Sequence, residues 1–262
     1  MSIGRTSPER LWQTDKVTLL DSAALADATA KILKGGVLGT NEKKYDTHKV
    51  SSELIEMLFG ELRDSSGVHV ETALAALGAV AGFSCQMALR ETIIKSGQLT
   101  EDKVFAAVKT KNGDTFYFGN SLNEILFANK PGALSIYEFV GGAAQKLGAK
   151  KLPNINEIVK YEAITLGGDD FGGLRLPNNH MPKSKPISLL DKFWNPFRNF
   201  LLINVPTPMH WPFVLGLSAQ MIIIEAKEVI DPGLAAEIVM QSAIPMAKID
   251  PSKIHLAYFQ IK

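Results

Sequence analysis

One long apolar stretch, residues 69–96, constrains the fold of this chain more than any other feature of its sequence. No charged residue lies between Thr72 and Arg90, no proline interrupts the stretch, and the helix-favouring residues alanine and leucine dominate it. We therefore predict one helix, roughly 40 Å long at 1.5 Å per residue. Small residues such as Gly78 and Gly82 occur on every side of this helix, and a helix that is apolar all round is buried all round. The sequence thus predicts a buried central helix against which neighbouring helices pack closely.

A membrane span is the competing interpretation of this stretch, because its length reaches the lower limit for crossing a bilayer. Alanine and glycine gain little from a hydrocarbon environment, however, and the flanks lack the aromatic residues typical of spanning helices. A second uncharged run, between Arg198 and Glu225, is divided by prolines. We therefore expect no membrane partner. Membrane association through residues 199–224 is kept only as a third hypothesis, weaker than the two functional hypotheses given at the end of this section.

Helical periodicity recurs along most of the remaining chain. Helices are predicted at residues 22–34, 48–64, 122–127, 135–148, 156–167, 188–202 and 233–248, and in the stretch after Pro212. A composition of 46% hydrophobic and 21% charged residues is typical of a globular protein with a sizeable core. The predicted fold class is mainly α, a multi-helix bundle around residues 69–96. We expect a single globular domain over residues 1–262, with a weak candidate boundary at 129–133.

The periodicity changes after Gly97. Residues 103–118 alternate on both sides of Asn112-Gly113, a dipeptide that accepts the positive φ angles of a type I′ turn. This pattern predicts a small antiparallel β-hairpin at about 103–118. The last residues of the chain, KIHLAYFQI, also alternate, and they are compatible with a C-terminal strand added to the hairpin.

Charge and cysteine usage exclude several classes of protein. Lys and Arg number 28 against 27 Asp and Glu, and no basic block occurs, so we expect no nucleic-acid partner. A single cysteine, Cys85, excludes an intramolecular disulfide and favours a reducing compartment. The N-terminus lacks the apolar core of a signal peptide. A cytoplasmic location is therefore expected.

No motif with a strong mechanistic signature occurs in the sequence. The chain contains no P-loop, no Rossmann glycine pattern after a strand, no HExxH, no paired CxxC and no GxSxG. Cys85 lies within the apolar stretch, where burial would raise the pKa of its thiol and shield it, so a structural role is the better interpretation.

Isolated polar side chains in the apolar helices are the next candidates for chemistry. Gln86, Gln145, Gln220 and Gln241 each lie in small or apolar helical runs, and a buried amide must be hydrogen-bonded. We expect these glutamines to bond to one another or to nearby backbone, with a polar ligand pocket as the alternative. The five histidines show no metal-ligand spacing, and a pair such as His69 and Glu71, two residues apart, would point apart on a helix.

Residues 167–186, GGDDFGGLRLPNNHMPKSKP, have no periodicity and form the best candidate for a functional loop. A segment of this length without regular structure is uncommon in a compact domain and is usually either functional or disordered. Its apolar residues are more numerous than in a flexible linker. We therefore predict an ordered loop laid across the helices, with Phe171 and Leu174 buried.

Four polar residues of this loop are the candidate binding residues: Asp169, Asp170, Arg175 and His180. Asp169, Asp170 and His180 could supply oxygen and nitrogen ligands to a metal ion. Aspartate is also favoured in glycine-rich turns for its turn chemistry alone, so we assign no metal and no cofactor.

The leading functional hypothesis is a soluble, non-enzymatic protein that binds a partner protein or a small ligand. The alternative is a metal-dependent or hydrolase-like enzyme that uses the 167–186 loop. Self-association into a homo-oligomer is compatible with either hypothesis.

Overall fold

The computed structural model describes residues 45–128 and 134–254. In chain order the elements are α2 (Thr47–Leu62), α3 (Val70–Leu89), the π-helical η2 (Arg90–Ile94), α4 (Glu101–Val104), β1 (Ala106–Lys109), β2 (Thr115–Phe118), α5 (Asn120–Phe127), α6 (Ile136–Lys146), α7 (Ile155–Thr165), η3 (Asn178–His180), α8 (Pro186–Asn204), η4 (Pro208–His210), α9 (Trp211–Glu225), α10 (Pro232–Met246) and η5 (Pro251–Lys253). The predicted helix at 22–34, the candidate boundary at 129–133 and the C-terminal strand beyond Ile254 lie outside the described residues.

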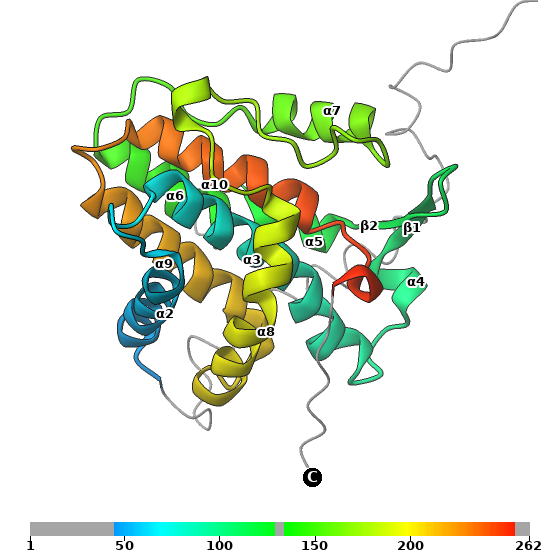
Figure 1. The fold of residues 1–262 in the computed structure, drawn as a ribbon. Coiled ribbons are helices and arrows are strands. Elements are labelled where there is room, and N and C mark those ends of the chain that lie inside the picture. The colour runs from blue at the N-terminus through cyan, green and yellow to red at the C-terminus, as the bar shows by residue number, and fades with distance from the viewer. Residues whose placement is uncertain (1–44, 129–133, 255–262) are drawn as a thin grey trace, which may run out of the picture.

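The central helix α3 runs through the middle of the bundle, as the sequence predicts. It lies between α10 and α9, and α8 crosses it (Figure 1). Every residue from Thr72 to Leu89 is buried. By length and composition, the segment Val70–Ile94 could cross a membrane, but its apolar window is entirely buried inside the protein, as in the core helix of a bundle.

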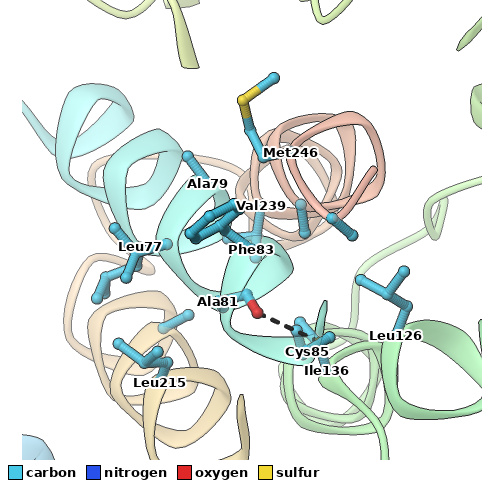
Figure 2. Packing of buried hydrophobic residues seen from close by; sticks show 14 of the residues in the cluster. Leu77, Ala79, Ala81, Phe83, Cys85, Leu126, Ile136, Leu215, Val239 and Met246 are labelled. Carbon is cyan, nitrogen blue, oxygen red and sulfur yellow. Dashed lines mark hydrogen bonds between the residues drawn. The ribbon is translucent and has the colours of Figure 1, made fainter. Parts of the chain in front are cut away.

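Two glycines of α3 allow the backbone of α10 to approach closely. A Cβ atom added to Gly78 would lie 2.5 Å from the carbonyl oxygen of Val239, and one added to Gly82 would overlap the carbonyl group of Ala243. Figure 2 shows the surrounding layer, in which Phe83 of α3 lies beside Val239 and Cys85 points toward α5 and α6. The buried hydrophobic residues of the described helices form one contiguous cluster around this contact.

The predicted hairpin is present, but its start and its turn differ from the prediction. Residues Glu101–Val104 form the short helix α4, and the strands pair from Ala106 opposite Phe118 to Lys109 opposite Thr115. The type I′ turn is wrong, because Gly113 (φ +87°) has a positive φ angle and Asn112 does not. Hydrogen bonds from Gly113 N to Thr110 O and from Thr110 N to Asp114 O instead close a three-residue loop with glycine in the left-handed position.

The loop that follows α7 is ordered and passes over α10 before it reaches α8 (Figure 1). Phe171 is half-buried, and its ring lies 4.8 Å from that of Phe116, between centroids. Leu174 is also half-buried against the core. The loop is therefore ordered and laid across the helices as predicted, but the prediction that both side chains are buried is wrong, because each is only partly buried against the core.

Candidate functional site

A buried carboxylate and a buried ammonium lie together beneath the hairpin. Glu162 of α7 and Lys248, which follows α10, are each only 3% exposed. Burial raises the pKa of Glu162 to about 7, against the opposing effects of the Gly172 N–H and of Lys248. Burial lowers the pKa of Lys248 to about 8, and the nearby Glu162 carboxylate opposes that shift. Each group thus partly compensates the desolvation of the other.

The loop and the hairpin both close over this pair. Gly172, in the left-handed conformation (φ +71°), donates its N–H to Glu162 Oε2 at 3.1 Å. The Lys248 Nζ lies 5.2 Å from the centroid of the Phe118 ring, and the N–H of Tyr117 donates to the Lys248 carbonyl oxygen at 2.9 Å. Glu162 and Lys248 therefore connect α7, the first part of the 167–186 loop, the end of α10 and strand β2.

Cys85 is fully buried in the same region of the core. Burial raises the pKa of its thiol well above the ordinary value, and its Sγ donates to the Ala81 carbonyl oxygen at 3.3 Å (Figure 2). A shielded, protonated thiol is a poor nucleophile, which favours the structural role expected from the sequence.

Two of the glutamines singled out in the sequence bond to backbone, as expected. Gln86 Nε2 donates to the carbonyl oxygens of Ala247 (2.8 Å) and Ile249 (3.1 Å), on either side of Lys248, and its Oε1 accepts from Arg90 Nε at 2.9 Å. Gln241 Oε1 accepts from the backbone N–H of Arg175 at 2.7 Å. These amides fix the chain after α10 and the 167–186 loop against the helices.

An open cleft of about 350 Å³ lies at the surface beside the buried pair. Its walls come from the hairpin, from the start of the 167–186 loop and from the chain around η5. Its lining residues are Asn112, Asp114, Thr115, Phe116, Gly167, Gly168, Asp169, Phe171, Ile187, Met246, Ile249, Asp250 and Lys253. The hydrogen bond from Asn112 Nδ2 to the Gly167 carbonyl oxygen (3.1 Å) holds the hairpin turn to the loop at one edge.

The cleft has an apolar part and a charged rim. The apolar part comes from Phe116, Phe171, Ile187, Met246 and Ile249. At the rim, Lys253 Nζ lies 3.0 Å from Asp114 Oδ1, and this hydrogen bond, with the charge of Asp250, raises the pKa of Lys253. Asp250 Oδ1 also accepts from the backbone N–H of Ser252 at 2.9 Å, which fixes its orientation.

The structure places the four predicted binding residues in different surroundings. Asp169 lines the cleft, whereas Asp170 is exposed and is not among the lining residues. The Arg175 guanidinium lies 4.3 Å from the centroid of the Tyr161 ring. His180 lies farther along the loop, where the loop passes the first turn of α3. Its side chain contacts Glu71 of that turn, a contact that the sequence did not predict.

His180 belongs to a cluster of two histidines around Glu71. Its Nδ1 lies 2.8 Å from Glu71 Oε1, and His69 Nε2 lies 3.4 Å from Glu71 Oε2. Burial raises the pKa of Glu71, but the hydrogen bond with His180, backbone hydrogen bonding and the charges of both histidines together bring it below its ordinary value. The expectation that His69 and Glu71 point apart is wrong, because His69 is the N-cap of α3 with an extended backbone (φ −75°, ψ 109°). Within residues 45–128 and 134–254, no group of three or more His, Cys, Asp or Glu side chains is placed to hold a metal ion.

The buried pair and most of the cleft were missed from the sequence, although one signal was present. Glu162 occupies the same helical face as Ile155, Ile158 and Val159, at the spacing of a buried stripe. A glutamate at such a position is buried with the stripe. Lys248, by contrast, is the last residue of the predicted helix 233–248, but in the structure α10 ends at Met246, so helical periodicity does not place its side chain.

Comparisons of the chain with protein-family models, with curated proteins and with solved structures give no match. The functional proposal below therefore depends on the geometry of the described residues.

Proposed function

We propose that this protein binds a small ligand in the cleft between the hairpin and the 167–171 loop. The observation that carries the proposal is the combination of an apolar floor with a rim of polar side chains in a cleft of about 350 Å³. Small-molecule sites in proteins are concave, mostly apolar and equipped with a few polar groups, at volumes of roughly 300–1,000 Å³.

The cleft is held in shape before any ligand arrives. The Phe116–Phe171 ring contact and the Asn112–Gly167 hydrogen bond join the hairpin wall to the loop wall. The isolated β-bridge between Phe116 and Ile249 joins the hairpin to the third wall, the chain before η5. Largely preformed sites bind without a large ordering cost, which supports a role in binding.

Binding is favoured over catalysis by the position of the shifted groups. A catalytic site needs convergent groups with displaced pKa values that can reach a substrate. Glu162 and Lys248 have such values, but each is 3% exposed and neither lines the cleft. Buried groups of this kind can instead hold the loop and the hairpin in register, because Glu162 accepts the Gly172 N–H and the Lys248 carbonyl oxygen accepts the Tyr117 N–H.

A ligand screen with a cleft-filling variant tests this proposal. Small metabolites that raise the melting temperature of the wild type would be titrated calorimetrically into Thr115→Trp, which places a large side chain in the cleft. Lys111→Trp is the matched control, because Lys111 is exposed in the same hairpin turn and does not line the cleft. Ligands should bind the wild type and Lys111→Trp alike and lose affinity for Thr115→Trp. An absence of ligands, or equal binding by both variants, would refute the proposal.

A further inference from the structure

The charges at the rim of the cleft point to one chemical class of ligand. Three carboxylates, those of Asp114, Asp169 and Asp250, line it, against one ammonium, that of Lys253. The cleft is therefore negative by two formal charges, whereas the whole chain has a net charge of +1. The negative charge is thus a local property of this surface, and it would attract cations and repel anions.

These carboxylates already hold a cation that belongs to the protein. The Lys253 ammonium lies 3.0 Å from Asp114 Oδ1 and feels the charge of Asp250, while 58% of its side chain is exposed. Because an exposed ion pair of this kind is weak and mobile, a ligand ammonium can join it or displace it. Asp169 lies on the loop wall and supplies a further carboxylate.

The apolar floor distinguishes an organic cation from an inorganic one. The rings of Phe116 and Phe171 meet at 64° between their planes, and the accessible apolar surface comes from the half-buried Phe171 and from Ile187, which is 37% exposed. A hydrated metal ion gains nothing from such a surface. An aromatic or aliphatic body gains hydrophobic contact there, and aromatic faces also attract a nearby cation.

From this arrangement we infer that the cleft binds an organic amine: a ligand with a positively charged amino group at the acidic rim and an apolar body against Phe171 and Ile187. The inference rests on the proposed function, since it names the ligand class for the same cleft.

Three probes that share one phenylbutyl body test the charge requirement: phenylbutylamine, phenylbutanol and phenylpentanoate, titrated calorimetrically at low ionic strength. The amine should bind roughly tenfold more tightly than the alcohol, and the acid should bind more weakly still. Rising salt should weaken binding of the amine more than that of the alcohol. Equal affinity for amine and acid, or no detectable binding of the amine, would overturn the inference.

Two charge-changing variants of the cleft should change the affinity for the amine in opposite directions. A purely structural role of the two residues would not produce this opposition. Asp169→Asn should weaken binding of the amine by roughly threefold or more, on the scale of an exposed ion pair. Lys253→Met should strengthen it, because the competing ammonium is removed. Asp170→Asn is the control, since it changes the same charge on the neighbouring, exposed residue outside the lining. A weaker amine affinity in Lys253→Met, or equal effects of Asp169→Asn and Asp170→Asn, would contradict the inference.

The failure of this inference differs from the failure of the proposed function. If the screen yields neutral or anionic ligands that Thr115→Trp excludes, the cleft is a ligand site and the amine assignment is wrong. If Thr115→Trp excludes no ligand, the cleft is not a ligand site, and both proposals fall.

Discussion

Replacing Gly82 with alanine should destabilise the protein, although alanine is the better helix former. A Cβ atom at this position would overlap the carbonyl oxygen of Ala243 and lie 2.7 Å from its Cα. These are backbone atoms of α10, so no side-chain rotation can relieve the contact. Helices α3 and α10 would have to move apart by roughly 1.5 Å to restore ordinary van der Waals distances.

The expected magnitude follows from two opposing effects. Overpacking of a core costs about 1–3 kcal/mol, and a backbone contact belongs at the upper end or beyond. The gain in helix propensity from glycine to alanine offsets about 1 kcal/mol. We therefore expect a net loss of about 2 kcal/mol for Gly82→Ala, or roughly 4–8 °C in melting temperature. Gly82→Leu and Gly78→Leu should cost several kcal/mol, because the larger side chain extends the same overlap.

Urea unfolding followed by circular dichroism gives the free energies, and Gly60→Ala is the matched control. Gly60 also lies within a helix, α2, but a Cβ atom there would meet nothing within 4 Å. The same substitution should therefore stabilise the protein at Gly60, by up to about 1 kcal/mol, and destabilise it at Gly82. The same sign at both positions, or a gain in stability at Gly82, would refute the close-packing argument.

Two further predictions concern the polar clusters. Because the pKa of Glu162 is raised from 4.5 to about 7 in the folded protein, the stability contributed by its protonated form is lost as the pH rises from 4.5 through 7. Glu162→Gln should flatten this fall in urea unfolding across that pH range, and an unchanged slope would contradict the assignment. His180→Ala removes the 2.8 Å contact with Glu71 and should increase amide hydrogen exchange at residues 178–183 with a stability loss of about 1 kcal/mol. Unchanged exchange there would show that the contact does not hold the loop.

Helices were predictable because their signals are local. The uncharged run of α3 and the small residues Gly78 and Gly82 indicate a buried, closely packed helix without knowledge of its neighbours. Pro232 after Asp231 marks the start of α10, and Asp231 Oδ1 does accept the N–H of Leu234 at 2.9 Å. The predicted helix at 233–248 contains Pro245, and α10 ends one residue after this proline, at Met246.

Local signals were insufficient where a backbone conformation or a distant partner decides the outcome. Asn112-Gly113 favours a type I′ turn in isolation, but here the Asn112 side chain bonds to Gly167, a contact outside the reach of any local pattern. His69 and Glu71 meet only because the cap residue leaves the helical path. The cleft was not predictable for the same reason, because the hairpin, the 167–171 loop and η5 form its walls from separate parts of the chain.

The packing of the core also determines where the cleft lies. Because α3 and α10 touch at Gly82, Gln86 lies one turn farther along α3 and reaches the carbonyl oxygens of Ala247 and Ile249. Ile249 is thereby held in line with Phe116 of β2, to which it is bridged, and it contributes to the apolar floor. The next residue, Asp250, is carried with it to the rim. A ligand site at this surface therefore depends on small residues in the buried helix, and a substitution that separates α3 from α10 would alter the cleft without touching a lining residue.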